Sequence, residues 1–506
     1  MHEKLIPTIE FDKPQDHCAV SGIISFNGRD VSRDTIRSIY KQQNRGQGGS
    51  GIATYDSFGG DFRLHKGIGL VSDVFHQDSV QTYSLSGFLS IGHDRYATTG
   101  SKDKPEAEKV LCLQPYVVKQ NRRSIALAHN GNIPEHYLGP LKDQLLPGTK
   151  LQSDTDSEIL AWRILQAEGE NWKQKIVNGL AGVKGAYSLA IATDEGDLFG
   201  IKDPLGIRPL VFAKTFDGAA VVSETHGFED MKGVHDRREL RNGEMVHITP
   251  DGKIEFMQVF PNTKTARCIV EPIYIRHPNS REGEFEVSEI RYRMGQRLAR
   301  EFPVPEGFVV VGIPDSGLEI ANGYSNELRR SNYSSIIIKD RYRDGIRSFI
   351  EDKNEDRLAV LKGKFSVSER ARGLRVILID DSLIRGNTTP VVIEKLFQAG
   401  VGEVCLGLGS PMFIETCDLG VNIASRSELK ALEEWGSEYK VKTAEQIAKE
   451  IGASKVYFLS LEGLIDSIDG EPQGYCTNCL TRKHPIRDLV QSEEYIYRAL
   501  SEILAA

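Results

Sequence analysis

A run of four apolar residues, Val376 to Ile379, ends in two adjacent acids, Asp380 and Asp381. An apolar run of this length, bounded by turn residues, predicts a strand that is buried on both faces, as in a parallel sheet. A loop of small and hydroxyl residues follows, and a helix begins after it. Because both faces of such a strand must be covered, this stretch constrains the fold of the second half of the chain more than any other.

The loop after this strand is suited to hold a sugar phosphate. Its residues are Ser382, Arg385, Gly386, Asn387, Thr388 and Thr389. Backbone N–H groups at a helix start and nearby hydroxyls bind phosphate, and the two acids can take ribose hydroxyls or a metal. The alternative is an ordinary strand–turn–helix unit with acids at its lip. The full order D-D-S-x-x-R-G-x-T-T is rarer than a lone glycine motif and resembles the phosphoribosyl pyrophosphate (PRPP) loop of type I phosphoribosyltransferases.

Length and composition exclude several classes of protein. The chain of 506 residues should hold two or more domains. Its net charge of -8 argues against a nucleic-acid surface, and its apolar runs are too short for a transmembrane helix. The N-terminus lacks the basic start and apolar core of a signal peptide. Seven cysteines in such a chain indicate a reducing cytoplasm, with thiols used for metal binding or catalysis.

The first half reads as short strands separated by turn residues. We expect strands at Ser21–Ser25, Gly51–Tyr55, Leu89–Tyr96, Ile125–His129, Ala186–Thr193, Ala219–Ser223 and Glu244–Ile248, and helices at about Arg33–Asn44 and Asp156–Ala167. Strands and helices segregated in this way predict an α+β sandwich.

The second half alternates strands with helices. We expect strands at Phe308–Ile313, Ser334–Ile338, Val376–Ile379 and Glu403–Leu408, with helices at about Leu318–Arg330 and Pro390–Ala399. This alternation predicts a doubly wound α/β domain with a parallel sheet. The long basic stretch from Asp340 to Gly373 has the length of a lid or a disordered loop.

Cys18 stands at the start of the first expected strand, where a cysteine is by itself most simply a buried core residue. Other motifs in this half change that interpretation. One expected strand ends in Arg95 with Thr98 close behind, another ends in Asn130 and Gly131, and a helix begins at Asp156. These motifs together resemble the class II glutamine amidotransferase domain, an αββα sandwich of the Ntn-hydrolase type.

The resemblance implies roles for these residues. Cys18 would attack the side-chain amide of glutamine, with its own α-amine as the base. Asn130 and the Gly131 N–H would form the oxyanion hole. Arg95 would bind the glutamine carboxylate with help from Thr98, and Asp156 would bind its ammonium group.

Cys18 is not the first residue of the chain, so its amine can act only after residues 1–17 have been removed. The resemblance allows this removal, since some members carry a short propeptide. We therefore expect a propeptide over residues 1–17, an amidotransferase domain over 18–262 and a second domain over 263–506.

Motifs in the second half of the chain indicate which molecule accepts the ammonia. Its motifs are Cys268–Tyr274, Pro314–Gly317, Arg341 and Arg347 in the basic stretch, the PRPP loop, and Leu459–Leu464. They resemble amidophosphoribosyltransferase, the glutamine PRPP amidotransferase family that catalyses the first step of de novo purine synthesis. In this family ammonia displaces pyrophosphate at the ribose C1 and gives 5-phosphoribosylamine.

The resemblance also implies the acceptor site. Asp380 and Asp381 would manage the ribose hydroxyls and Mg²⁺, and Ser316 matches a third magnesium position. The 5′-phosphate would lie in a cradle of Ser382, Arg385, Gly386, Thr388 and Thr389. Arg347 would close over pyrophosphate with its loop.

The chain departs from the family pattern at a few positions. Ala19 replaces a glycine, Arg276 replaces a small residue, His277 replaces an arginine and Asn387 replaces a threonine. The basic loop is two residues longer than usual. These departures concern packing and the kinetics of the PRPP loop more than the type of reaction.

Cys476 and Cys479 form a CxxC pair that alone could be a zinc half-site, a redox pair or a coincidence. Together with Cys268 and Cys417 they resemble the ligand set of a [4Fe–4S] cluster in some family members. The residues alone do not separate this cluster from structural zinc, because both accept four thiolates. Cys112 and Cys405 match no site.

Two rivals to an active enzyme are a PRPP-sensing regulator and a degenerate paralogue with weak transferase activity. A complete glutaminase constellation argues against a sensor, which needs no nucleophile. The expected ligands are glutamine, PRPP and inhibitory purine nucleotides, and the resemblance suggests a homotetramer or dimer.

Overall fold

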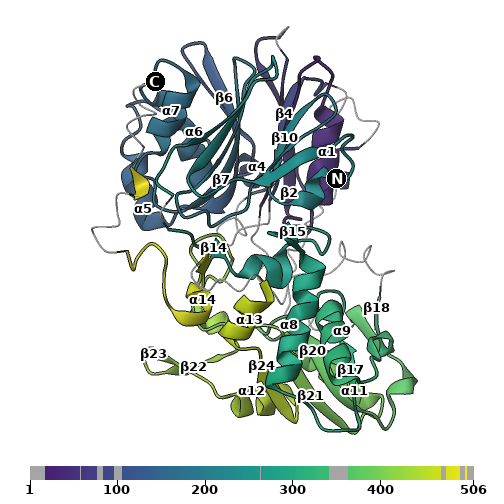
Figure 1. The fold of residues 1–506 in the computed structure, drawn as a ribbon. Helices are drawn as coiled ribbons and strands as arrows, with labels where there is room; N and C mark the ends of the chain where they lie inside the picture. Colours follow the sequence, from purple (N-terminus) through teal and green to yellow (C-terminus); the bar gives the residue numbers. More distant parts are fainter. Residues whose placement is uncertain are drawn as a thin grey trace.

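The computed structural model describes residues 18–56, 59–76, 84–95, 105–262, 264–340, 363–468, 474–489 and 496–498. Two antiparallel sheets, packed face to face, form the first half (Figure 1). In sheet order, the first contains β11 (His235–Glu239), β9 (Val211–Lys214), β10 (Gly218–Val222), β1 (Ala19–Ser25), β4 (Leu89–Arg95), β2 (Gly49–Tyr55) and β3 (Phe62–Ile68). The second contains β13 (Ile254–Gln258), β12 (Glu244–Ile248), β8 (Leu198–Lys202), β7 (Ala186–Thr193), β6 (Arg123–Asn132) and β5 (Tyr116–Gln120).

Small apolar residues let these two sheets approach each other. Ala126 and Ala190 share one buried cluster with Val20 and Ile24 of β1. A Cβ at Gly22 would lie 2.8 Å from Leu198 Cδ1, so the facing strands leave no room for a larger residue there.

Helices cover both outer faces of the pair of sheets. The first sheet carries α1 (Ser32–Lys41) and α2 (Val71–Val74), and the second carries α6 (Asp156–Gln166) and α7 (Trp172–Leu180). The short helices α4 (Glu106–Leu111), α5 (Glu135–Lys142) and η2 (Thr225–Phe228) lie in the connections. The predicted αββα sandwich is therefore confirmed.

The second half contains the predicted parallel sheet, in the order β17 (Phe308–Gly312), β20 (Arg375–Asp380), β21 (Glu403–Leu408) and β24 (Lys455–Phe458). On β20, Ile377 and Ile379 pack in one cluster with α8 (Val287–Glu301), α9 (Gly317–Leu328) and α13 (Leu461–Ile468). Val376 and Leu378 pack in another with α11 (Thr388–Gln398) and α12 (Ala444–Ile451). Both faces of the strand are thus buried, which explains its unbroken apolar run.

Two glycines let α8 and α9 pack closely on the same face of this sheet. A Cβ at Gly295 would lie 1.9 Å from the Ile320 carbonyl oxygen, and one at Gly323 would lie 1.8 Å from that of Tyr292. The close contact holds α9, which precedes the PRPP loop, firmly against the helix that leads in from the first half (Figure 1).

One predicted strand is wrong in its bounds and its place. Ser334–Ile336 forms a 3₁₀ turn, and β18 (Ile337–Lys339) pairs antiparallel with β19 (Phe365–Val367), outside the parallel sheet. The β-branched residues of this run favour a strand. However, the chain contacts the edge of β17 there through a single bridge, between Val310 and Asn332.

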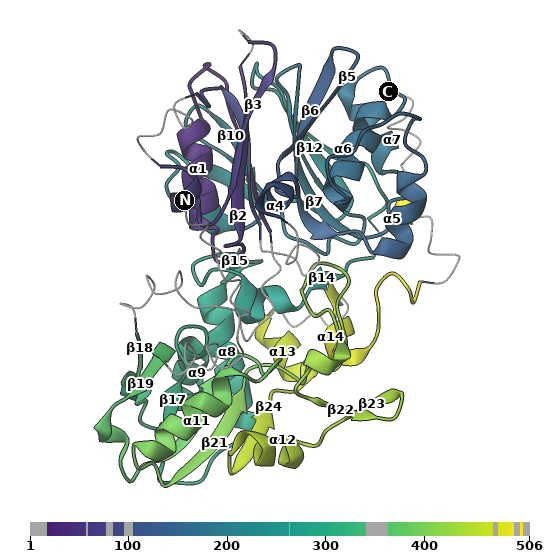
Figure 2. The same ribbon diagram turned by 180° about the vertical axis from the view of Figure 1, so that it is seen from behind.

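The two halves meet through short elements that Figures 1 and 2 show between them. These elements are β14 (Arg267–Cys268), η3 (Glu271–Ile275), β15 (Arg281–Glu282), β16 (Phe285–Glu286), β25 (Tyr475–Cys476) and α14 (Asn478–Thr481). The hairpin β22 (Leu432–Trp435) and β23 (Glu438–Val441) lies apart from them. Ile269 and Ile273 share a buried cluster with Ala186 and Leu205 of the sandwich, so the halves have a common core.

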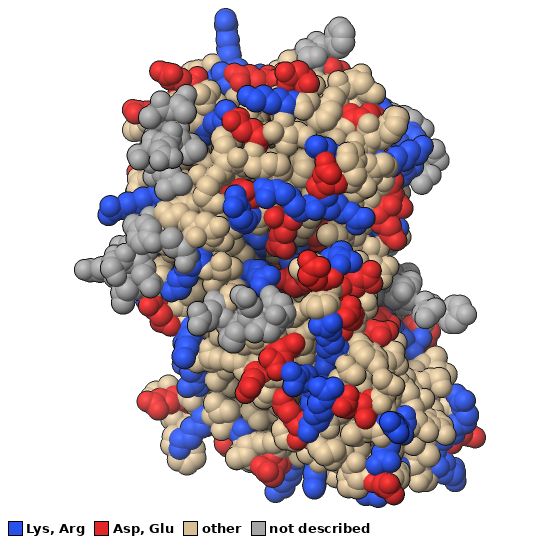
Figure 3. Space-filling model, in the orientation of Figure 1, with Lys and Arg blue, Asp and Glu red and all other residues tan. Residues whose placement is uncertain are grey.

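Residues 496–498 lie against the first half. The Gly182 N–H donates to the Tyr497 carbonyl at 2.9 Å, and Tyr497 is buried. On the face in Figure 3, Lys and Arg are interspersed with Asp and Glu, as the mixed composition predicts. None of the helices in the described ranges is both long and apolar enough to cross a membrane.

Asp94 on β4 is a buried carboxyl with no hydrogen-bond partner for either oxygen. Burial raises its pKa well above the ordinary value, and Ser50, its register partner on β2, offsets this only in part. A carboxyl whose pKa is higher in the folded state binds more protons there. It therefore lowers stability as pH rises above the unfolded value of about 4.

We expect Asp94→Val to stabilise the protein, because it removes a buried polar group without a partner from a strand. The gain should be roughly 1–3 kcal/mol at pH 8 and smaller at pH 5. Denaturant unfolding at the two pH values measures it, with the parent protein as reference. An equal gain at both pH values would show that the carboxyl does not titrate as described.

Candidate active sites

Cys18 lies immediately before β1, at the end of the first sheet where this inner strand begins, and is partly exposed. Its backbone carbonyl accepts a hydrogen bond from Arg45 Nε at 3.0 Å. The pairing of β1 with β4 matches Ala19 with Asp94, so Arg95 stands at the same sheet edge as Cys18. The predicted nucleophile and the predicted carboxylate-binding arginine are thus brought together by strand register.

Ser223 connects the start of β1 with Asn130 on the opposite sheet. Its hydroxyl accepts from the Val20 N–H at 2.9 Å and from Asn130 Nδ2 at 3.4 Å. No role for Ser223 was predicted from the sequence, because its hydroxyl contacts residues that are distant along the chain. Through this bridge the predicted oxyanion-hole amide lies close to the strand that begins after Cys18.

Gly131 occupies a position that only glycine fits. A Cβ there would lie 1.9 Å from the Ala186 carbonyl oxygen. A Cβ at Gly420, in the second half of the chain, would lie 3.3 Å from the Gly131 carbonyl carbon, and Asn132 Nδ2 donates to the Asp418 carbonyl at 2.8 Å. The end of β6 that carries the predicted oxyanion hole therefore abuts the transferase half.

Asp156 opens α6 and is tied to the same strand end. Its Oδ2 accepts from the Ile133 N–H at 2.9 Å, and its Oδ1 accepts from the Ser157 N–H at 2.7 Å. Burial opposes its ionisation, but the nearby His129 and these N–H groups outweigh burial and lower its pKa. Asp156 is therefore available as an anion beside Asn130.

The Arg95 guanidinium donates to the Cys112 carbonyl. This contact gives Cys112 a structural place near the site, although its thiol matches no predicted role. Thr98, the other predicted glutamine contact, lies outside the described residues, as do residues 1–17.

The predicted second site lies where β20 ends. The Asp381 N–H donates to Asp380 Oδ1 at 2.8 Å, and the Ser382 hydroxyl donates to Asp381 Oδ1 at 2.5 Å. Ser316 occupies the N-cap position of α9, and the helix begins at the next residue, Gly317. A Cβ at Gly317 would lie 2.6 Å from the Ile379 carbonyl oxygen, so Ser316 and the two acids come together at one edge of the sheet.

The predicted phosphate cradle leads from β20 into α11. Gly386 has a φ of +72°, a left-handed conformation that favours glycine, and Thr388 and Thr389 form the first turn of the helix. The Thr389 hydroxyl is buried without a hydrogen-bond partner. An unpaired buried hydroxyl at this position is suited to a ligand oxygen.

Arg385 and Arg347 were both predicted to contact PRPP. Arg385 Nε and Nη2 donate to Glu428 Oε2 at 2.9 and 2.7 Å, so an acidic residue holds this guanidinium in the structure. Arg347 lies outside the described residues.

The four cysteines predicted as cluster ligands converge from three parts of the chain. Cys268 on β14 pairs with Cys476 on β25, and the Cys479 carbonyl accepts from the Ile414 N–H at 2.8 Å, near Cys417. Burial raises the pKa of Cys268 to about 11, and the nearby Cys417 contributes to the rise. Burial also raises the pKa of Cys479, with the other three thiols adding to it.

We call these four residues the cysteine tetrad. Within the described residues, no group of three or more His, Cys, Asp or Glu side chains is arranged to hold a metal ion.

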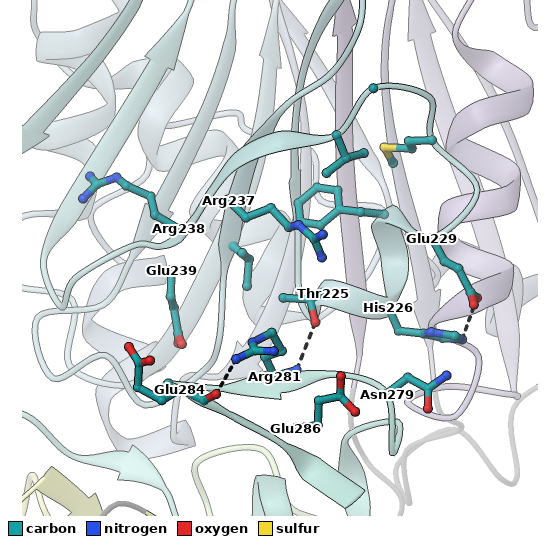
Figure 4. A pocket seen from close by; sticks show the side chains of 16 residues that line it. Thr225, His226, Glu229, Arg237, Arg238, Glu239, Asn279, Arg281, Glu284 and Glu286 are labelled. Atoms are coloured by element: carbon teal, nitrogen blue, oxygen red, sulfur yellow. Dashed lines mark hydrogen bonds and ion pairs between the residues drawn. The ribbon is translucent and has the colours of Figure 1, made fainter. Parts of the chain in front are cut away.

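A separate groove of about 1060 Å³ lies between η2 and the β15–β16 hairpin (Figure 4). Its wall carries cationic and anionic side chains, among them His226, Arg237, Glu239, Arg281 and Glu286. It contains none of the predicted substrate residues, so it is distinct from both sites described above.

Known proteins match both halves. A family model described as a glutamine amidotransferase domain matches residues 108–230. The amidophosphoribosyltransferase of Archaeoglobus fulgidus is 34% identical over 480 residues, which cover 93% of this chain and 98% of that protein. That of Bacillus subtilis is 34% identical over 476 residues and covers 93% and 94% of the two chains.

Solved structures agree with these relatives. Glutamine PRPP amidotransferase from B. subtilis, complexed with ADP and GMP, superposes with a TM-score of 0.80 at 32% identity, over 94% of this chain and 99% of that one. A structure described as the allosteric regulatory enzyme of purine biosynthesis has a TM-score of 0.81, also at 32% identity, over 96% and 99%.

The fold and its two sites define a glutamine amidotransferase joined to a phosphoribosyltransferase. The chain belongs to the amidophosphoribosyltransferase family. It is therefore a glutamine-dependent pentosyltransferase of purine biosynthesis, as the sequence analysis predicted.

Proposed function

We propose that Cys18 hydrolyses glutamine and that the released ammonia reacts with PRPP at the Asp380–Asp381 edge. The observation that carries this proposal is the convergence of Cys18, Arg95 and Asn130 at one edge of the sandwich. The Cys18 thiolate attacks the side-chain amide, and the Asn130 amide with the Gly131 N–H stabilises the negative oxygen that forms. The acyl-enzyme is then hydrolysed to glutamate.

Recognition of glutamine needs a cation for its carboxylate and an anion for its ammonium group. Arg95 supplies the first and Asp156 the second, with Thr98 assisting. The lowered pKa of Asp156 supports its role, because the carboxylate stays ionised wherever glutamine carries its ammonium group.

The base for Cys18 is the α-amine of the same residue, with a reference pKa of about 7.7–8.0. That amine exists only when residues 1–17 have been cleaved off. Cys18 stands at the start of β1 and is partly exposed, which supports a chain that can begin there.

At the second site, the nitrogen of ammonia bonds to C1 of the ribose while the C1–oxygen bond to pyrophosphate breaks. Asp380 and Asp381 hold the ribose hydroxyls, and the first turn of α11 with Ser382, Arg385, Gly386, Thr388 and Thr389 binds the 5′-phosphate. Arg347 binds pyrophosphate. Ser316, Asp380 and Asp381 have the hard oxygen donors that suit Mg²⁺, which would neutralise charge on pyrophosphate.

Ammonia has to pass between the sites without meeting water, where it would become ammonium. The apolar cluster shared by the two halves and the contact of Asn132 with Asp418 support such a passage. A B. subtilis relative binds ADP and GMP, and we propose that purine nucleotides inhibit this enzyme too. We further propose a homo-oligomer, a tetramer or a dimer, in the cytoplasm, where the seven free cysteines would stay reduced.

We also propose that the cysteine tetrad holds a [4Fe–4S] cluster with a structural role. The convergence of four buried or partly buried thiols supports this proposal, since ligation by four cysteines is usual for such a cluster and some members of the family that this chain resembles carry one. Cys268, Cys417, Cys476 and Cys479 would supply the ligands. The cluster would join η3 and the C-terminal segment, and no reaction step depends on it.

Cys18→Ala should abolish glutamine-dependent release of pyrophosphate from PRPP, because the nucleophile is lost. The rate with added ammonia should stay within about twofold of the parent enzyme, since the second site is unchanged. Cys112→Ala, at the neighbouring buried cysteine, is the matched control and should keep both rates. If ammonia also fails in a folded Cys18→Ala protein, the transferase step is absent, as in a PRPP sensor or a degenerate paralogue.

The purified active enzyme should begin at Cys18. Intact-mass spectrometry would then show loss of residues 1–17, because only a free Cys18 amine can act as the base. Cys18→Ala should retain the segment if the thiol is needed for its removal. A protein that keeps residues 1–17 and still hydrolyses glutamine would rule out the amine mechanism.

Anaerobically purified protein should be brown, with about four irons and four sulfides per chain. Cys479→Ser should lose most of the iron, whereas Cys405→Ser, a buried cysteine on β21 away from the tetrad, should keep it. Iron and zinc are measured by elemental analysis. Stoichiometric zinc in place of iron would refute the cluster.

A further inference from the structure

A buried carboxylate of the transferase half contacts the residue that holds Cys18. Glu271 opens η3 and is 2% exposed. Its two oxygens accept from Arg45 Nη1 at 2.9 Å and Nη2 at 2.8 Å. The third donor of the same guanidinium, Nε, binds the Cys18 carbonyl at 3.0 Å.

Two further arginines fix this carboxylate. Arg208 Nη1 donates to Glu271 Oε1 at 3.1 Å, and Arg276 Nε lies 3.6 Å from Oε2. Burial opposes ionisation, but the three guanidinium groups outweigh it and keep the pKa of Glu271 far below its ordinary value. Arg208 itself is anchored, because its Nε and Nη2 donate to the Leu419 carbonyl at 3.2 and 2.9 Å.

We infer that Glu271 is a positioning residue for Cys18 and acts through Arg45. This inference rests on the proposed role of Cys18 as the nucleophile. Glu271 lies in the transferase half and binds no substrate atom in the proposed mechanism. Its effect is to hold the two terminal nitrogens of the Arg45 guanidinium, so that the Nε–H stays directed at the Cys18 carbonyl.

The geometry explains why this contact matters for the nucleophile. The Val20 N–H is held by Ser223, and the Cys18 carbonyl is held by Arg45, so the start of β1 is fixed from two sides. Without the carboxylate, the fully buried guanidinium loses two bonds and has to find other partners. A displacement of about 1 Å in a reacting group can cost on the order of 100-fold in rate.

The expected defect is confined to one half-reaction. Transfer of free ammonia takes place at the Asp380–Asp381 edge and does not involve Cys18. A variant that only displaces Cys18 should therefore lose glutamine-dependent synthesis and keep ammonia-dependent synthesis. Loss of overall folding would reduce both.

The test compares Glu271→Gln with Glu244→Gln. Glu244 on β12 is also fully buried and also held by two arginines, Arg238 at 2.6 Å and Arg241 at 3.0 Å, and neither of these is bonded to Cys18. We expect Glu271→Gln to lower kcat with glutamine about 10- to 100-fold while the ammonia-dependent rate stays within about twofold. Glu244→Gln should leave the ratio of the two rates unchanged.

A second measurement reports on the Cys18 thiol directly and does not require turnover of substrate. The rate of Cys18 alkylation by iodoacetamide, measured by mass spectrometry, should change at least about threefold in Glu271→Gln and stay constant in Glu244→Gln. If Glu271→Gln does not fold, Glu271→Asp keeps the charge and shortens the side chain. It should give a smaller defect of the same kind.

Equal loss of both rates in a folded Glu271 variant, or no change in the rate ratio and in alkylation, would overturn the inference. Failure of the proposed function is seen separately, because Cys18→Ala would then still use glutamine.

Discussion

The structure depends on the neutralisation of buried charge where its two halves meet. Arg45 and Arg208 come from the sandwich, whereas Glu271 comes from the segment that enters the transferase half. Removing an ion from water costs several kcal/mol, and only well-placed partners offset that cost. These charges can be buried only when the halves adopt one relative position, so their pairing fixes the geometry on which transfer of ammonia depends.

The five residues of η3, which include Glu271, lie between Cys18, the cysteine tetrad and the Asp380–Asp381 edge. Glu271 contacts Arg45 beside Cys18, and Cys268 of the tetrad lies just upstream. Burial raises the pKa of Tyr274, and Asp381 and the thiols of Cys479, Cys268 and Cys417 add to the rise, so this side chain lies near both. Arg291 of α8 donates to the carbonyls of Pro272 and Ile273, which satisfies backbone groups that the irregular turn leaves free. A short segment thus connects glutamine hydrolysis, the PRPP edge and the cysteines.

Local patterns predicted the main strands of each sheet and the helices α1, α6, α9 and α11, whereas many of the shorter strands and helices were not predicted. The apolar run of β20 and the alternation in the first half were sufficient for the fold class. Strand β3 was missed because FRLHKGI is largely polar and only partly buried, and its place comes from pairing with β2. The run at Ser334–Ile338 had the propensity of a strand, but the chain there meets the edge strand β17 only through a bridge at Asn332, and Ile337 and Ile338 pair with β19 instead.

The residues of the predicted sites divide in the same way, into those found from local motifs and those found only in the structure. Cys18, Asn130 and Asp156 were found through motifs, and the structure brings them together. Ser223 lies in a predicted strand and Glu271 in the Cys268–Tyr274 motif, but neither was assigned a role, because their importance arises from partners far away in sequence, 203 residues in the case of Ser223 with Val20. Long-range contacts of this kind are absent from any local pattern.

The same reasoning explains the two departures from the family pattern at the junction. The buried Arg276 is paired with Glu282 at 2.6 Å and lies within 3.9 Å of Glu239. The His277 ring stacks on that of His226 with ring centroids 3.6 Å apart, and the His277 backbone N–H donates to Glu224 Oε2 at 2.9 Å. Each unusual residue is thus matched by a partner, and neither has a contact with the Asp380–Asp381 edge among those described. These two departures therefore lie where the two halves are joined.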